Sequence, residues 1–199
     1  MRRFLLAVLF APFLFSSCAA YLPEFQDVST LQKGEQRVAV GAYGGGIGKS
    51  NIGVSAFYAT HSDENSDFNV QLAVGGRFEG DQFPLVVTAL TGPKFVNQKG
   101  TIAWYVPVGF SFELEEPVLL STPTIYRRIG KKHPTISRTL FYRQEIASVS
   151  GYDGLMGYGT FGYRYGWIAD GKRQFVNINV SAANIFIGYG IDLANTSKK

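Results

Sequence analysis

Residues 101–114 read TIAWYVPVGFSFEL, and an apolar side chain stands at every second position. Successive side chains of a β-strand point to opposite faces, so the stretch predicts a strand with two different faces. Its apolar face carries Ile102, Trp104, Val106, Val108, Phe110, Phe112 and Leu114. Its other face is mostly small or polar, with Thr101, Ala103, Tyr105, Pro107, Gly109, Ser111 and Glu113. A tilted strand needs about 9–11 residues to cross a membrane, so this one is long enough to do so.

The same alternation returns elsewhere in the chain. Residues 67–79, 155–167 and 174–183 alternate clearly, and residues 83–91, 118–128 and 137–149 do so less regularly. Turn-forming residues separate them, and no segment with helical periodicity exceeds two turns. Strands at hairpin spacing pair with antiparallel neighbours, and closing the sheet removes its exposed edges. The sequence therefore predicts an all-β, antiparallel up-and-down barrel over residues 36–193, with a tail at residues 194–199.

Residues 1–17 have the parts of a signal peptide. Arg2 and Arg3 supply positive charge, residues 4–15 are apolar, and Ser16 and Ser17 are the small residues that precede a cleavage site. The apolar stretch is shorter than the roughly 18 residues of a spanning helix. We therefore expect an exported protein without a membrane helix.

Cys18, the only cysteine, follows this segment directly. Its position resembles the bacterial lipoprotein box, in which the cysteine is lipidated and becomes the new N-terminus. The resemblance implies a lipid anchor at Cys18, and ordinary cleavage after Ala19 or Ala20 is the alternative. Residues 18–35 have weak periodicity, so we expect them to form a tether that leads to the barrel.

Alternation alone fits two kinds of barrel, and the polar face distinguishes them. A soluble barrel of the lipocalin kind keeps apolar side chains inside, whereas a membrane barrel turns them toward lipid and has a polar lumen. A water-facing surface is expected to be rich in Lys, Glu and Thr, but here this face is mainly Gly, Ala, Ser, Asn and Gln. Charged residues make up 17% of the chain, below the roughly 25% of soluble domains. The composition favours a membrane barrel with a narrow lumen.

The number of strands depends on two short segments. If residues 44–49 and 183–184 are turns, the barrel has ten strands; if residues 37–60 and 174–193 are single strands, it has eight. Bacterial barrels have even counts and longer connections on the outer side. With periplasmic termini, the eight-strand count sends the longer connections outward, at 61–66, 92–100, 129–137 and 168–173. We therefore favour eight strands, with ten as the alternative.

This pattern resembles the small eight-stranded outer-membrane barrel proteins over residues 36–193. The resemblance implies a location in the bacterial outer membrane. Two features depart from it. Pro107 lies within the clearest strand, where it removes a ladder hydrogen bond, and the chain ends in NTSKK at residues 195–199, without the aromatic residue common at barrel C-termini.

Charged residues within the strands are candidates for a paired network in the lumen, because a charge removed from water needs a partner. These residues are Arg77, Glu79, Glu113, Arg143, Glu145 and Arg164. Basic residues of the longer connections are candidates for a rim that attracts lipid phosphates. These are Lys94, Lys99, Lys131, Lys132, Lys172 and Arg173. The expected partner is outer-membrane lipid, with lipopolysaccharide as the candidate on the outer side.

No motif in the sequence predicts catalysis, a cofactor or a metal site. The stretch GGGIGKS at residues 44–50 contains the residue types of a phosphate-binding loop but not their spacing. His61, Ser62, Asp63 and Glu64 offer catalytic residue types, but they lie in an expected turn without a rigid frame. The 19 basic and 15 acidic residues nearly balance, which argues against nucleic acid as a partner.

The sequence thus favours a small non-catalytic outer-membrane barrel with a structural or surface-binding role, lipid-anchored at Cys18. A periplasm-facing lipoprotein whose soluble barrel binds an apolar ligand is one alternative. A barrel enzyme that modifies lipid through His61 is another. The oligomeric state does not follow from the sequence.

Overall fold

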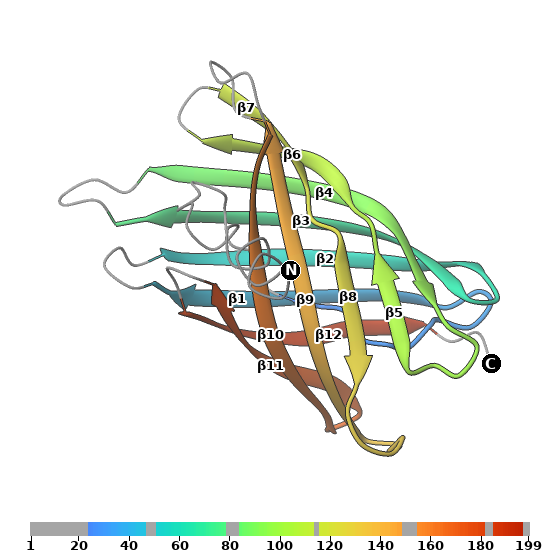
Figure 1. Ribbon diagram of the computed structural model, residues 1–199. Helices are drawn as coiled ribbons and strands as arrows, with labels where there is room; N and C mark the ends of the chain where they lie inside the picture. Colours follow the sequence, from blue (N-terminus) through green and yellow to red (C-terminus); the bar gives the residue numbers. More distant parts are fainter. Residues whose placement is uncertain are drawn as a thin grey trace, which may run out of the picture.

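The computed structural model describes residues 24–46, 51–78, 84–113, 116–148, 155–181 and 185–196, and they form one antiparallel sheet (Figure 1). Its strands are β1 (Gln36–Gly45), β2 (Asn51–Asp63), β3 (Ser66–Arg77), β4 (Leu85–Val96), β5 (Ile102–Tyr105), β6 (Val108–Glu113), β7 (Glu116–Ser121), β8 (Thr124–Arg128), β9 (Ile136–Ser148), β10 (Leu155–Ala169), β11 (Lys172–Ser181) and β12 (Ile185–Thr196). The predicted all-β, antiparallel fold is confirmed.

The sheet closes into a barrel because β1 pairs with β2 on one side and with β12 on the other. Around the ring each strand pairs with its neighbours in sequence. The two short strands β5 and β6 follow one another along β4 and together occupy one position of the ring, and β7 and β8 do the same along β9. The closed barrel therefore has ten strands. The predicted count of eight is wrong, and the ten-strand alternative is right.

The eight-strand count failed at the two segments on which it depended. Gly45 pairs with Asn51 and Val180 pairs with Ile185, so each segment joins two antiparallel strands. Gly45 and Gly46 have φ values of 143° and 139°, which side chains with a Cβ rarely adopt. Glycine therefore permits the chain to leave β1 here, although the apolar phase of the sequence continues across the turn.

Pro107 lies at a break between β5 and β6, and a second break separates β7 from β8 at Thr122 and Pro123. The two breaks face each other, because Tyr105 pairs with Thr124 and Val108 pairs with Ser121. The Pro107 carbonyl accepts hydrogen bonds from the Thr122 amide at 3.3 Å and the Ser121 hydroxyl at 2.8 Å. Pro107 and Pro123 thus lie opposite each other, so the hydrogen bonds lost to proline are confined to this break. The register of the two strands is the same on either side of it.

The barrel is apolar outside and polar inside. Phe110 and Phe112 of β6 are each 50% exposed, and Val54, Leu72 and Ile187 are exposed likewise. Many inward side chains are buried and polar, among them Asn69, Gln71, Thr88, Ser111, Asn177 and Asn179. The apolar side chains from Trp104 to Phe112 thus point outward, as the sequence predicted for a membrane barrel and in contrast to a lipocalin-like one.

Large inward side chains fill the lumen where neighbouring strands present glycine. A Cβ on Gly53 or Gly75 would overlap the Tyr43 ring, and one on Gly190 would overlap Phe175. Tyr43 of β1 reaches across Gly53 of β2 to Gly75 of β3, and Phe175 of β11 lies over Gly190 of the adjacent β12, so each large side chain occupies volume that glycine leaves open. This alternation of large and small residues is typical of narrow barrels.

The start of β1 and the end of β12 lie at one mouth of the barrel, where Gln36 pairs with Thr196. We call this the terminal mouth. Successive ring positions are antiparallel, so the chain returns to this mouth after every second position. The connections β2–β3, β4–β5, β8–β9 and β10–β11 therefore lie there too. The eight-strand count had placed these connections opposite the termini, so the ten-strand topology reverses that assignment. Among the described residues, no helix is long and apolar enough to cross a membrane.

Gly109→Ala tests the close approach of β4 and β6. The new Cβ would overlap the Ala89 carbonyl oxygen and lie 2.9 Å from the Leu90 Cα, so the sheet must shift. We expect a loss of about 1–3 kcal/mol in the free energy of unfolding, measured by denaturant titration. Gly44→Ala is the matched control, because its Cβ would meet nothing closer than 3.6 Å. Equal stability of the two variants would contradict this packing.

Candidate functional site

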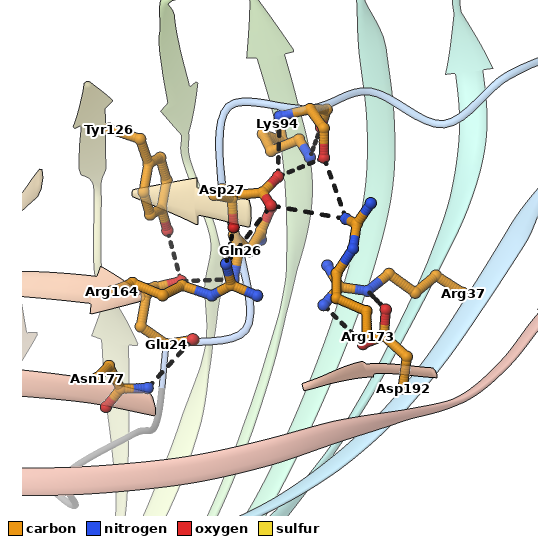
Figure 2. A network of polar contacts seen from close by, with 12 residues as sticks. Glu24, Gln26, Asp27, Arg37, Lys94, Tyr126, Arg164, Arg173, Asn177 and Asp192 are labelled. Atoms are coloured by element: carbon orange, nitrogen blue, oxygen red, sulfur yellow. Dashed lines mark hydrogen bonds and ion pairs between the residues drawn. The ribbon is translucent and has the colours of Figure 1, made fainter. Parts of the chain in front are cut away.

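Residues 24–31 run inside the barrel rather than tethering it from outside. Glu24, Phe25, Gln26, Asp27 and Val28 are each at most 3% exposed. We call residues 24–31 the plug. Its Leu31 end lies near the terminal mouth, and its Glu24 end lies deeper in the lumen, beside Arg143 and Asn177 (Figure 2). The predicted tether at residues 18–35 is therefore wrong for this part of the chain.

Glu24 is held by side chains from three strands. Its carboxylate accepts a hydrogen bond from the Tyr126 hydroxyl at 2.8 Å and pairs with the Arg143 guanidinium at 2.5 Å. Its backbone carbonyl accepts a hydrogen bond from the side-chain amide of Asn177 at 3.2 Å. Because β8, β9 and β11 each contribute one partner, the position of Glu24 is fixed only when the barrel is closed.

Asp27 pairs with two arginines of the barrel wall. Its Oδ2 lies 3.4 Å from Nη1 of Arg164 and 3.6 Å from Nη1 of Arg173, and its Oδ1 accepts a hydrogen bond from the Ser29 amide at 2.9 Å (Figure 2). Burial alone would raise the pKa of Asp27, but the positive charges of Arg173 and Arg164 outweigh it and hold this pKa well below its usual range. Asp27 is therefore an anion at neutral pH.

The part of the plug nearest the terminal mouth is bound by β2, β3 and β4. The Leu31 amide donates to Asp67 at 3.0 Å, and the Leu31 carbonyl lies 2.9 Å from Nδ1 of His61. Lys94 bridges plug and wall, because its ammonium donates to the Ser29 carbonyl at 2.6 Å and pairs with Asp67 at 2.8 Å. This ammonium is thus fully engaged inside the barrel.

Phe25 provides the apolar contact of the plug. Its ring stacks on Phe57 at a centroid distance of 5.3 Å and meets Phe175 edge-on at 5.4 Å. Arg164 lies over the other ring, with its Cζ 4.3 Å from the Phe175 centroid. An aromatic anchor therefore sits between the two carboxylates of the plug.

The plug balances the charge of the lumen. In the described part of the wall, the inward charged side chains that are buried or ion-paired include five cations, Arg37, Lys94, Arg143, Arg164 and Arg173. Three anions face them, namely Asp67, Glu145 and Asp192. Arg37 and Asp192 form a two-bonded pair of their own, at 2.9 and 2.8 Å. Glu24 and Asp27 supply two further carboxylates, so the plug neutralises an excess of positive charge.

Three of the six residues predicted for a lumen network have described side chains, and Arg164 pairs with Asp27 of the plug rather than with one of them. Arg143, Glu145 and Arg164 are buried and face inward, and Arg143 lies 4.0 Å from Glu145. Arg77 and Glu113 belong to β3 and β6, but their side chains, and Glu79 altogether, lie outside the described residues. The signal peptide and Cys18 also lie outside them.

The predicted basic rim is only partly a rim. Lys94 belongs to β4 and is buried in the lumen, so its assignment to a loop is wrong. Arg173 is 34% exposed and also faces inward, toward Asp27. Lys99, Lys131, Lys132 and Lys172 are exposed near the terminal mouth. The rim therefore lies at the mouth where the barrel strands begin and end.

Sequence reasoning missed the two plug carboxylates and the role of His61 in binding Leu31. The available signal was the apolar residues Phe25, Val28 and Leu31 among the polar residues of 24–31, since a solvated tether needs no large apolar side chains. Among the described residues, no cluster of three His, Cys, Asp or Glu residues could hold a metal ion. In comparisons with known proteins, no family model and no curated protein matches this chain.

Asp27→Asn should release the plug. The change leaves Arg164 buried without a carboxylate partner, which costs about 3–5 kcal/mol for a buried pair. We expect faster amide hydrogen exchange across residues 24–31. Glu35→Gln is the matched control, because this neighbouring side chain bonds the Gln32 amide at a solvent-exposed position. Unchanged protection in the Asp27 variant would contradict the anchoring role.

The stabilising effect of Asp27 should depend on pH in a defined direction. Its folded-state pKa is depressed, so its contribution is complete above the unfolded pKa of about 3.9. As pH falls below this value, the unfolded state takes up the proton first and the contribution shrinks. The difference in unfolding free energy between wild type and Asp27→Asn should be constant from pH 7 to about 5 and decline below about 4. A decline already at pH 6 would refute the depressed pKa.

Proposed function

We propose that this protein is a small β-barrel of the bacterial outer membrane, with a structural or surface-binding role and no catalytic function. The observation that carries the proposal is the direction of the side chains. Apolar residues face outward on most strands of the ring, including Val54, Leu72, Phe110, Ile125 and Ile187. In water such a surface would be a severe aggregation hazard, whereas lipid is its natural solvent.

The dimensions of the strands agree with this proposal. The uninterrupted strands have 10 to 15 residues, against the about 9–11 that a tilted spanning strand needs. Closure leaves no unpaired sheet edge, which a membrane interior would not tolerate. The proposed signal peptide and a lipid on Cys18 would bring the chain to the same membrane.

The plug argues for a sealed barrel and against a channel. Glu24, Phe25 and Asp27 occupy the lumen and are bound to the wall by ion pairs and ring contacts. A water-filled path through the lumen would require this segment to leave. The protein therefore presents its lipid-facing exterior and its mouths to partners, and not a conduit.

The soluble-barrel alternative has less support, because an apolar ligand would have to bind in a lumen lined by charged and amide side chains. A lipid-modifying enzyme using His61 also has less support, since the contact of Nδ1 with the Leu31 carbonyl gives this residue a structural role in holding the plug. Neither alternative has an observation of its own in its favour.

Leu72→Arg distinguishes lipid from water around the barrel. This side chain is 51% exposed in the middle of β3, so arginine would face the bilayer core. We expect a loss of about 2–4 kcal/mol in the free energy of folding into phosphatidylcholine vesicles. The folded fraction is measured by heat-modifiable migration on gels.

Gln98→Arg is the control, because Gln98 is exposed in the β4–β5 connection. It should change the folding free energy by less than about 0.5 kcal/mol. If Leu72→Arg is equally harmless, or if the chain lacking residues 1–17 folds in water without detergent or lipid, the membrane proposal is wrong.

A further inference from the structure

A cavity of about 290 Å³ opens at the terminal mouth. The plug forms its floor through Asp27, Val28 and Ser29, and the β8–β9 connection at residues 129–135 covers it. Residues 136–139 of β9 and 166–168 of β10 complete the wall. The volume is at the lower end of the range for small-molecule sites, which is about 300–1,000 Å³.

Strand alternation shows which basic side chains point into this cavity. On β8, Tyr126 is buried and Arg127 is exposed, so Arg128 faces inward. On β11, Phe175 and Asn177 are buried, so Arg173 faces inward as well. Two arginines, from strands that β9 and β10 separate, therefore share one cavity. Arg138 also borders it, but its side chain lies on the outer face, next to the inward Thr139.

The cavity has an excess of positive charge. Lys131 and Lys132 of the covering connection add to Arg128 and Arg173, and Asp27 is the one carboxylate among the lining residues. Asp27 is already shared between Arg164 and Arg173. In the described part of the chain, Arg128, Lys131 and Lys132 make no ion pair. The surplus therefore has no internal counter-charge.

An unpartnered polar group lies in the same place. Thr139 is fully buried, lines the cavity, and its hydroxyl has no hydrogen-bond partner. Its neighbour Ser137 is already engaged, because it receives a hydrogen bond from Arg164 at 3.3 Å. Buried polar groups without partners are rare in folded proteins, so the Thr139 hydroxyl points to a ligand with a hydrogen-bonding group at this position.

We propose that this cavity binds a phosphate group. Arginine pairs with phosphate through two parallel hydrogen bonds, and Arg128 and Arg173 present guanidinium groups from two sides. The Thr139 hydroxyl supplies a neutral donor deeper in the site. The group is either a free phosphate or the headgroup of an anionic lipid, and both share this chemistry. The site does not depend on the outer-membrane location, because it is built from the lumen side of the barrel.

The test measures phosphate binding to the full chain folded in octyl glucoside, a detergent without charge. Binding is followed by isothermal titration calorimetry. Inorganic phosphate should give heats that saturate at millimolar concentration or below, and chloride at equal ionic strength should not. Arg128→Gln should weaken binding at least tenfold.

Arg127→Gln is the matched control, because it removes the same charge from the adjacent, outward position. Its affinity should remain within twofold of wild type. Heat-modifiable migration of both variants verifies that each is folded. The proposal is overturned if Arg127→Gln and Arg128→Gln weaken binding equally, since the effect would then be one of general charge.

A second arm distinguishes the two sources of phosphate. Micelles doped with phosphatidic acid replace the inorganic phosphate, with phosphatidylcholine as the control lipid. Saturable, Arg128-dependent binding of phosphatidic acid alone assigns the site to a lipid headgroup, and binding of inorganic phosphate assigns it to a free anion. Absence of saturable binding in both arms refutes the site while leaving the membrane proposal, tested by Leu72→Arg, unaffected.

Discussion

The arrangement of the lumen depends on the ion pairs between the plug and the barrel wall. Arg143 and Arg164 are removed from water by closure of the sheet, and Glu24 and Asp27 are their partners. A buried cation without a carboxylate would destabilise the closed state. The plug is therefore an integral part of the barrel interior, and the segment before β1 folds together with the strands rather than hanging from them.

The outer surface obeys the opposite constraint. In the membrane location that we propose, every backbone group must be bonded within the sheet, and the outward side chains must tolerate an apolar solvent. Two prolines, Pro107 and Pro123, interrupt the hydrogen bonds of the sheet. The chain limits this loss by placing them in facing breaks of neighbouring strands. Gly92 allows β4 to lie close to this point, because a Cβ there would overlap the Val106 carbonyl. The interruption of the ladder is thereby local and does not shift the register.

Most of the strand pattern could be predicted from alternation, because period two is a local property of the backbone. Residues 102–112 have the predicted faces, and Arg143, Glu145 and Arg164 point inward as expected. The strand count failed because a turn of glycines carries no side chains, so the apolar phase can continue across it. Lys94 was misplaced for a related reason, since Pro93 and Gly92 imitate a loop within a continuous strand.

The sequence by itself determined the class of fold, the two faces of the barrel and the composition of its interior, since all three follow from which residue types alternate. Only the tertiary structure decided that there are ten strands, that residues 24–31 enter the lumen and that the basic connections lie at the same mouth as the start of β1 and the end of β12. These properties depend on pairing between residues far apart in the chain, such as Glu24 with Arg143. No local pattern encodes such a pair, because either charge alone is equally consistent with an exposed position.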